Sequence, residues 1–92
     1  MADSSQSLDQ VITVGSKSGL HARPAAIVVQ KAKEFQSTVT FSKGEKTVNA
    51  KSLLSVLTLG AELGHQIHVT ISGSDAASAM EALVPLLEKD LG

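Results

Sequence analysis

The chain of 92 residues has no cysteine, no tryptophan and no tyrosine, and two phenylalanines are its only aromatic residues. The lack of cysteine excludes a disulfide, a thiol nucleophile and a zinc–cysteine site. With so few aromatic residues, the core has to be built from aliphatic side chains. No apolar run reaches the roughly 18 residues of a membrane-spanning helix. From these absences we expect a cytoplasmic protein without a membrane partner.

Charge of either sign is not in excess. Eight Lys and Arg residues stand against nine Asp and Glu residues, which gives a formal net charge of −1. A nucleic-acid-binding domain of this length normally has a strong basic excess, so no nucleic-acid partner is expected. Residues 1–7 have neither a basic start nor an apolar stretch, which argues against a signal peptide and predicts a disordered tail. Residues 8–92 are expected to form one domain, because they are too few for two cores.

What the sequence does contain is regular hydrophobic periodicity. Four segments alternate apolar and polar residues as β-strands do, at residues 8–14, 37–42, 46–50 and 65–72. Three segments repeat apolar residues at helical spacing, at residues 22–35, at residues 52–60 and from residue 76 onward. The order β-α-β-β-α-β-α predicts an α+β fold, an open-faced β-sandwich. In it, three helices cover one face of a four-stranded antiparallel sheet.

Turn and cap residues mark the ends of these segments. Gly44 can adopt the positive φ of a tight hairpin turn, and Gly60 can end a helix in the left-handed conformation. Ser52 and Asp75 stand where they can cap the two later helices. Pro85 lies inside the last helix, where an interior proline costs about 3 kcal/mol. That helix is therefore expected either to kink or to open to solvent at Pro85.

The stretch GLHARPAA, residues 19–26, contains the first candidate for chemistry. His21 is expected at the N-cap of the first helix, with Pro24 in the first turn, where a missing N–H costs little. The unpaired N–H groups of a helix start favour a negative group, and a neutral imidazole has a nucleophilic nitrogen. A phosphoryl group on His21 would meet these donors and the guanidinium of Arg23. Gly19 is expected to leave room for the backbone of a partner.

Two motifs resemble those of the HPr family, the histidine-containing phosphocarriers of the bacterial phosphoenolpyruvate:sugar phosphotransferase system. GLHARPA resembles the active-site signature of that family, and KSLLSVLTLG, residues 51–60, resembles its regulatory-serine segment. The resemblance extends over roughly residues 8–91. It implies a cytoplasmic, monomeric phosphoryl carrier that is not itself an enzyme and has no cofactor or metal. Enzyme I would be the donor, and sugar-specific enzyme IIA domains would be the acceptors.

The resemblance also implies roles for individual residues. His21 would be phosphorylated on Nδ1, and Arg23 would assist at the phosphoryl group. Ser52 would be the site that an HPr kinase/phosphorylase modifies. The implied partner-binding residues are Ala26, Gln30, Leu53, Leu54 and Leu57.

The sequence departs from the family at a few of these positions. Gln30 and Ser55 stand where some members have lysine, so the basic rim of the partner-binding surface is thin. Leu54 stands where Met or Phe is frequent. Pro85 interrupts the last helix on the side expected to face solvent. These departures bear on the choice of partner and not on the phosphoryl chemistry.

Other interpretations remain open. His21 can be an ordinary surface residue or cap, Ser52 a plain helix cap, and the leucines part of the core. The chain can also be a small phosphatase with His21 as nucleophile, although no carboxylate is near His21 in the sequence. Two further alternatives are a regulatory binding module and a paralogue in the nitrogen-related branch of the same system. His65 and His68 could form a metal site with His21, but a spacing of three residues along a strand places their side chains on opposite faces. Both are therefore expected to be polar surface residues.

Overall fold

A four-stranded antiparallel sheet forms one layer of the computed structural model, which describes residues 6–17 and 19–90. Its strand order is β1-β4-β2-β3. The strands are β1 (Gln6–Thr13), β2 (Thr38–Lys43), β3 (Lys46–Asn49) and β4 (Gln66–Gly73).

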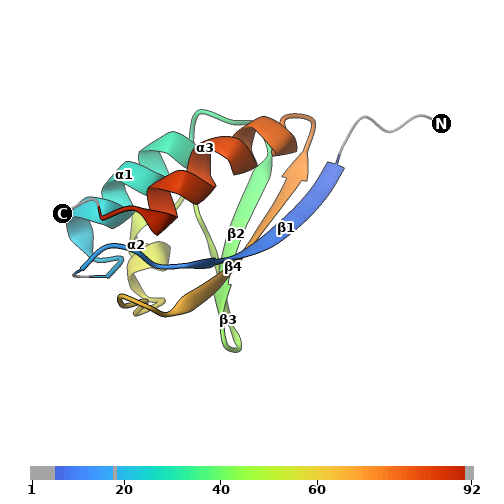
Figure 1. The fold of residues 1–92 in the computed structure, drawn as a ribbon. Coiled ribbons are helices and arrows are strands. Elements are labelled where there is room, and N and C mark those ends of the chain that lie inside the picture. Colours follow the sequence, from blue (N-terminus) through green and yellow to red (C-terminus); the bar gives the residue numbers. More distant parts are fainter. Residues whose placement is uncertain (1–5, 18, 91–92) are drawn as a thin grey trace.

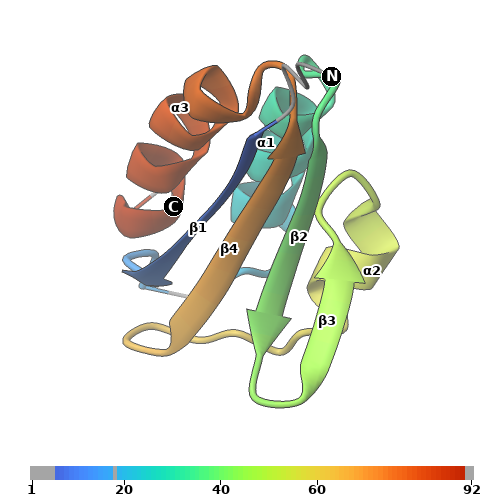
Figure 2. The ribbon, with the colours of Figure 1, turned by 90° about the vertical axis from the view of Figure 1, so that its right-hand side faces the viewer.

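The helices form the second layer of the fold. They are α1 (Ala22–Ala32), α2 (Leu53–Leu57) and α3 (Ala76–Glu88). Figures 1 and 2 show α1 and α3 side by side over one face of the sheet, and α2 near the β3 edge. The predicted element order and the α+β open-faced sandwich are both confirmed.

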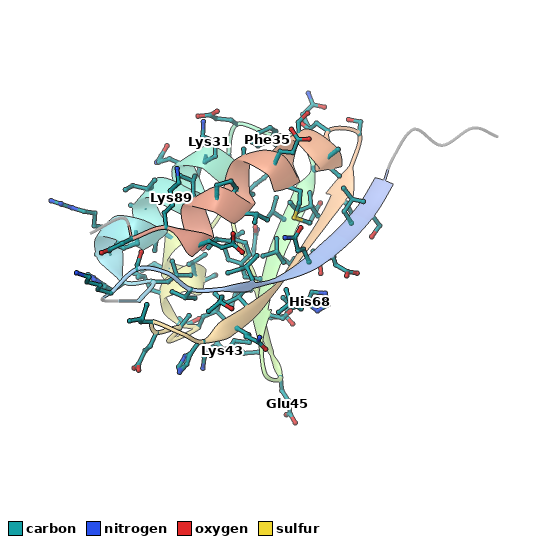
Figure 3. The ribbon with its side chains drawn as sticks, viewed as in Figure 1. Lys31, Phe35, Lys43, Glu45, His68 and Lys89 are labelled. Carbon is teal, nitrogen blue, oxygen red and sulfur yellow. The ribbon has the colours of Figure 1, made fainter. Side chains whose placement is uncertain are left out.

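The alternation along the strands divides the sheet into a buried face and an open face. The fully buried side chains of the central strand β4 are Ile67, Val69 and Ile71. On the open face, Val11 of β1 is 55% exposed and is the register partner of His68 on β4. The imidazole Nε2 of His68 lies 3.3 Å from a carboxylate oxygen of Asp9. Figure 3 shows His68 on the side of the sheet away from the helices. The helices therefore cover only the apolar face.

The ends of the elements agree with the predictions to within a few residues. Gly44 has a φ of +60° in the turn between β2 and β3, and Gly60 has a φ of +62° two residues beyond Thr58, the C-cap of α2. Helix α1 ends three residues earlier than predicted, although Phe35 beyond it still packs against the core. Strand β1 begins at Gln6, so Gln6 and Ser7 belong to the sheet and not to the expected tail. Residues 1–5 lie outside the described residues.

Asp75 does not cap α3 with its side chain, contrary to the prediction. It occupies the N-cap position, but its carboxylate accepts hydrogen bonds from the loop between α1 and β2. The donors are the backbone N–H groups of Gln36 and Ser37, each at 2.9 Å, and the hydroxyl of Ser37. These bonds lower the pKa of Asp75, the Ser37 hydroxyl having the largest effect. Asp75 thus ties together two loops distant in sequence.

Pro85 lies on the exposed side of α3, which continues past it to Glu88. A proline at this position leaves the carbonyl of Glu81, four residues earlier, without its usual donor inside the helix. Because both residues are exposed, water can take the place of that donor. Pro85 thus faces solvent, as one of the two expected outcomes has it.

Candidate functional site

His21 stands at the start of α1 with its side chain exposed. It is the N-cap residue, with an extended backbone (φ −102°, ψ −162°), and its side chain makes no capping hydrogen bond. Its carbonyl accepts the N–H of Ala25 at 2.9 Å, so the backbone of His21 is fixed to the helix. The predicted N-cap position is confirmed. The backbone of His21 is therefore fixed, while its imidazole is exposed and does not cap the helix.

The first turn of α1 adds positive character beside this imidazole. The N–H groups of Ala22 and Arg23 have no acceptor within the helix, and Pro24 has no N–H and is buried. The side chain of Arg23 is exposed, on the same first turn. The first turn of α1 therefore has two backbone donors, the helix dipole and the charged side chain of Arg23, and all of them favour an anion.

The loop before His21 is packed against the turn that follows α2. Leu20 is buried, and its N–H donates to the carbonyl of Ala61 at 2.8 Å. Gly19 has a φ of +77°, and a Cβ atom there would lie 2.5 Å from the Ala61 carbonyl oxygen. The space beside Gly19 is thus filled by Ala61 of the same chain. The expectation that Gly19 receives a partner's backbone is wrong.

A hollow of about 210 Å³ opens beside His21. It is lined by Leu20, His21, Leu57, Gly60, Ala61 and Glu62. Leu57, implied as a partner-binding residue, therefore shares a surface with His21. Glu62 was not expected in this site, because 41 positions separate it from His21 in the sequence. No local signal marks it, since its position follows from the packing of the loop on Ala61.

The start of α2 carries Ser52. Its hydroxyl oxygen accepts the N–H of Ser55 at 3.4 Å, so the predicted cap is confirmed. Next to it, the side chain of Leu54 is 76% exposed and that of Leu53 is 37% exposed. Burial in the core therefore does not account for these two leucines. Val56, between them and the end of α2, is fully buried.

The other two implied partner-binding residues, Ala26 and Gln30, line a second hollow. They border a groove of about 380 Å³ along α1, which reaches α3 at Leu86. An ion pair between Lys31 and Glu34, at 3.1 Å, lies on the same groove. Ala26 and Gln30 do not line the hollow beside His21. Of the implied partner-binding residues, only Leu57 lines the hollow beside His21.

The remaining histidines belong to local structure. The Nδ1 atom of His65 accepts the N–H of Glu62 at 3.1 Å, and His68 faces Asp9 on the open face. Within residues 6–17 and 19–90, no three His, Asp or Glu side chains cluster as metal ligands would. In the same part of the chain, no helix has the length and apolar character needed to cross a membrane.

An open-faced α+β sandwich with an exposed histidine at the start of its first helix matches one class of protein, the phosphocarriers. Residues 8–89 match the family described as PTS HPr component phosphorylation site. The chain is 46% identical over 81 residues to phosphocarrier protein HPr of Xylella fastidiosa strain Temecula1, which covers 88% of this chain and 91% of the relative. It is 40% identical over 83 residues to HPr-like protein Crh of Halalkalibacterium halodurans, and this match covers 90% of this chain and 99% of the relative.

Solved structures agree with the sequence relatives. The crystal structure of phosphocarrier protein HPr from Bacillus anthracis strain Ames superposes with a TM-score of 0.85 at 41% identity, covering 88% of this chain and 96% of that one. The chain therefore belongs to the HPr family of phosphocarrier proteins of the phosphotransferase system.

Proposed function

We propose that His21 accepts a phosphoryl group from phosphorylated enzyme I and passes it to sugar-specific enzyme IIA domains. The observation that carries this proposal is the exposed imidazole at the start of α1, unused as a cap, beside two unpaired N–H donors and Arg23. An imidazole nitrogen attacks phosphorus, and the bond between phosphorus and enzyme I breaks as the new P–N bond forms. In a second displacement, a nucleophile of enzyme IIA forms a bond to phosphorus as the P–N bond to His21 breaks.

The electrostatics of the helix start suit a carrier. The donors of Ala22 and Arg23 and the guanidinium stabilise charge on the transferring phosphoryl oxygens. Because the site is exposed, these interactions are moderate and the group can leave again. The partner supplies whatever else the transfer needs. This makes the chain a stoichiometric carrier, for which we propose a cytoplasmic location.

The phosphatase alternative gains one residue from the structure. Glu62 lines the same hollow as His21, so a carboxylate that could activate water is nearer than the sequence indicates. The lifetime of the phosphorylated protein separates the two functions. A carrier keeps its phosphoryl group for minutes or longer after enzyme I is removed, and Glu62→Gln leaves that lifetime unchanged. Loss within seconds that Glu62→Gln slows would establish the phosphatase instead.

The central experiment incubates the protein with phosphoenolpyruvate, Mg²⁺ and catalytic enzyme I. We expect one acid-labile phosphoryl group per chain. His21→Ala should lose this labelling with little change in Tm, because the side chain is exposed and makes no capping bond. His68→Ala, which removes an exposed imidazole from the open face, is the matched control and should be labelled normally. Labelling of His21→Ala would overturn the assignment.

We propose that the partners dock on the exposed leucines of α2 together with Ala26 and Gln30 on α1. Leu54→Ser should raise the KM for enzyme I-dependent phosphorylation about 5-fold, since an apolar contact residue is typically worth about 1 kcal/mol. Val11→Ser, at a 55% exposed position on the open face, is the matched control and should leave KM unchanged. Equal KM values for the two variants would place docking elsewhere.

We also propose that the chain is a monomer and that Ser52 is a regulatory phosphorylation site. The regulatory role is supported by the position of Ser52 at a helix start, close to the exposed Leu54.

Light scattering tests whether the chain is a monomer. Dimers are a realistic outcome, because structures of relatives include an HPr dimer from Thermoanaerobacter tengcongensis.

A further inference from the structure

The loop that leads to His21 is bonded to the C-terminal end of α3. The N–H of Gly15 donates to the carbonyl of Leu87 at 3.0 Å. The hydroxyl of Ser16 donates to the carbonyl of Lys89 at 3.2 Å, and the N–H of Lys17 donates to the carboxylate of Asp90 at 3.3 Å. We call these three hydrogen bonds the C-terminal latch. They join segments more than 70 positions apart.

The packing at the latch leaves no space for adjustment. A Cβ atom on Gly15 would lie 1.8 Å from the carbonyl oxygen of Glu88, so the two backbones are in direct contact. Ser16 is 1% exposed, and it is one of two polar residues that are buried in the described part of the chain. A buried hydroxyl that loses its partner is costly, so this bond favours one position of the loop.

The latch is connected to His21 through a short series of backbone contacts. The carbonyl of Ser16 accepts the N–H of Gly19 at 2.9 Å, which closes the turn before the site. Leu20 is then bonded to Ala61, and His21 follows directly. The loop is therefore held from two sides, by Ala61 after α2 and by the end of α3.

The end of α3 is itself a stiff support. The N–H of Lys89 donates to the carbonyl of Pro85 at 3.1 Å, which closes the last turn, and Lys89 then turns to an extended backbone. The ring of Pro85 fixes φ at the start of this turn. Pro85 costs the helix one hydrogen bond, but it also restricts the backbone conformation of the last turn, which precedes the acceptors of the latch.

We propose that Ser16 and Asp90 are positioning residues for phosphoryl transfer, acting through the loop that carries His21. The proposal rests on the proposed function of His21 as the acceptor. Neither residue contacts the phosphoryl group. Their hydrogen bonds restrict the positions of the imidazole relative to a docked donor, and small displacements of a reacting group have large effects on rate.

The test uses the full chain with Ser16→Ala, Asp90→Ala and Asp90→Asn, and Ser72→Ala on the open face as control. At a temperature well below Tm, Ser16→Ala and Asp90→Ala should lower the kcat of enzyme I roughly 3- to 10-fold at unchanged KM. Asp90→Asn keeps an oxygen acceptor for the N–H of Lys17 and should restore most of the rate. Ser72→Ala should behave as the unmodified chain.

A second measurement does not depend on phosphoryl transfer. In ¹H–¹⁵N spectra, the His21 imidazole and the Leu20 amide should shift or broaden in Ser16→Ala and Asp90→Ala and not in Ser72→Ala. Unchanged spectra and rates within 1.5-fold would overturn the latch, as would a change in KM alone. If the spectra change but His21→Ala is still labelled, the proposed acceptor is wrong and the latch stands only as a structural feature.

Discussion

The starts of α1 and α3 each carry a polar side chain that does not cap its own helix, and the two side chains differ in what they contact. The carboxylate of Asp75 accepts hydrogen bonds from three donors of Gln36 and Ser37, in the loop between α1 and β2. The imidazole of His21 is exposed, and only its backbone is bonded to the helix. One helix start stabilises the fold, whereas the other is available for a ligand.

This difference agrees with the proposed site at α1. A group that joins two loops must keep its partners, so it has no freedom to bind and release a phosphoryl group. His21 has its backbone fixed at Ala25 and its loop fixed at Ala61, which leaves the side chain to react without loss of structure. Substitutions at the two helix starts should therefore separate transfer from stability.

The largest effect on this comparison is expected from Arg23, on the first turn of α1. Arg23→Ala should slow phosphoryl transfer roughly 10- to 100-fold, because one positioned donor to developing charge is worth about this much or more. Arg23→Lys keeps the charge but not the planar fork, so its rate should lie between the two. Rapid-quench measurements of single-turnover transfer from enzyme I give the rates. Equal rates for all three proteins would show that Arg23 is only a solvated helix residue.

The next effect concerns Asp75 and is confined to stability. The folded-state pKa of Asp75 lies below its ordinary value of 3.8, chiefly because of the Ser37 hydroxyl. Its stabilising contribution is therefore present above about pH 4 and disappears as the pH falls through the lowered pKa. Urea unfolding of the unmodified protein and of Asp75→Asn should give curves that differ at pH 6 and approach each other toward pH 2–3.

Two observations check the cause of that pH dependence. Ser37→Ala should lower the free energy of unfolding by roughly 1 kcal/mol, or about 4–8 °C in Tm for a domain of this size. Ser37→Ala should also make the free energy of unfolding depend less on pH between pH 6 and pH 2. Both variants should accept phosphoryl groups normally at 25 °C. A difference between the unmodified protein and Asp75→Asn that stays constant from pH 6 to pH 2 would contradict the role of the Asp75 charge.

The contrast between the two helix starts was only half visible in the sequence. The periodicity of strand β4, the turn at Gly44 and the N-cap position of His21 are local properties, and all were predicted. The partners of Asp75 are not local, because Ser37 is 38 positions away. The sequence around Asp75 is typical of a helix cap. Only the folded chain shows that the carboxylate of Asp75 accepts hydrogen bonds from Gln36 and Ser37 and none from its own helix.

The same reason limited the prediction of the site. Glu62 comes beside His21 because Gly19 and Leu20 pack against Ala61, and that packing depends on the whole fold. The C-terminal latch joins Ser16 to Lys89 across 73 positions. Motifs point to the residues that we propose for the chemistry, whereas the residues that hold them in place leave no local pattern.

The smallest effect is expected at the third helix start, where Ser52 both caps α2 and adjoins the exposed Leu54. A phosphate on Ser52 would add about −1.5 to −2 charges at neutral pH, and a negative group at a helix start is favoured by the dipole. Ser52→Asp has the same sign of charge and keeps a capping oxygen, so Tm should be unchanged or slightly higher.

The effect of the Ser52→Asp charge is expected on association, because the charge must be desolvated when a partner covers Leu54, which weakens binding. Steady-state kinetics with enzyme I should show a KM raised a few-fold at nearly constant kcat, while Ser72→Asp on the open face changes neither. If Ser52→Asp has the KM of the unmodified chain, Ser52 is only a helix cap, and like Asp75 it contributes to the fold and not to regulation.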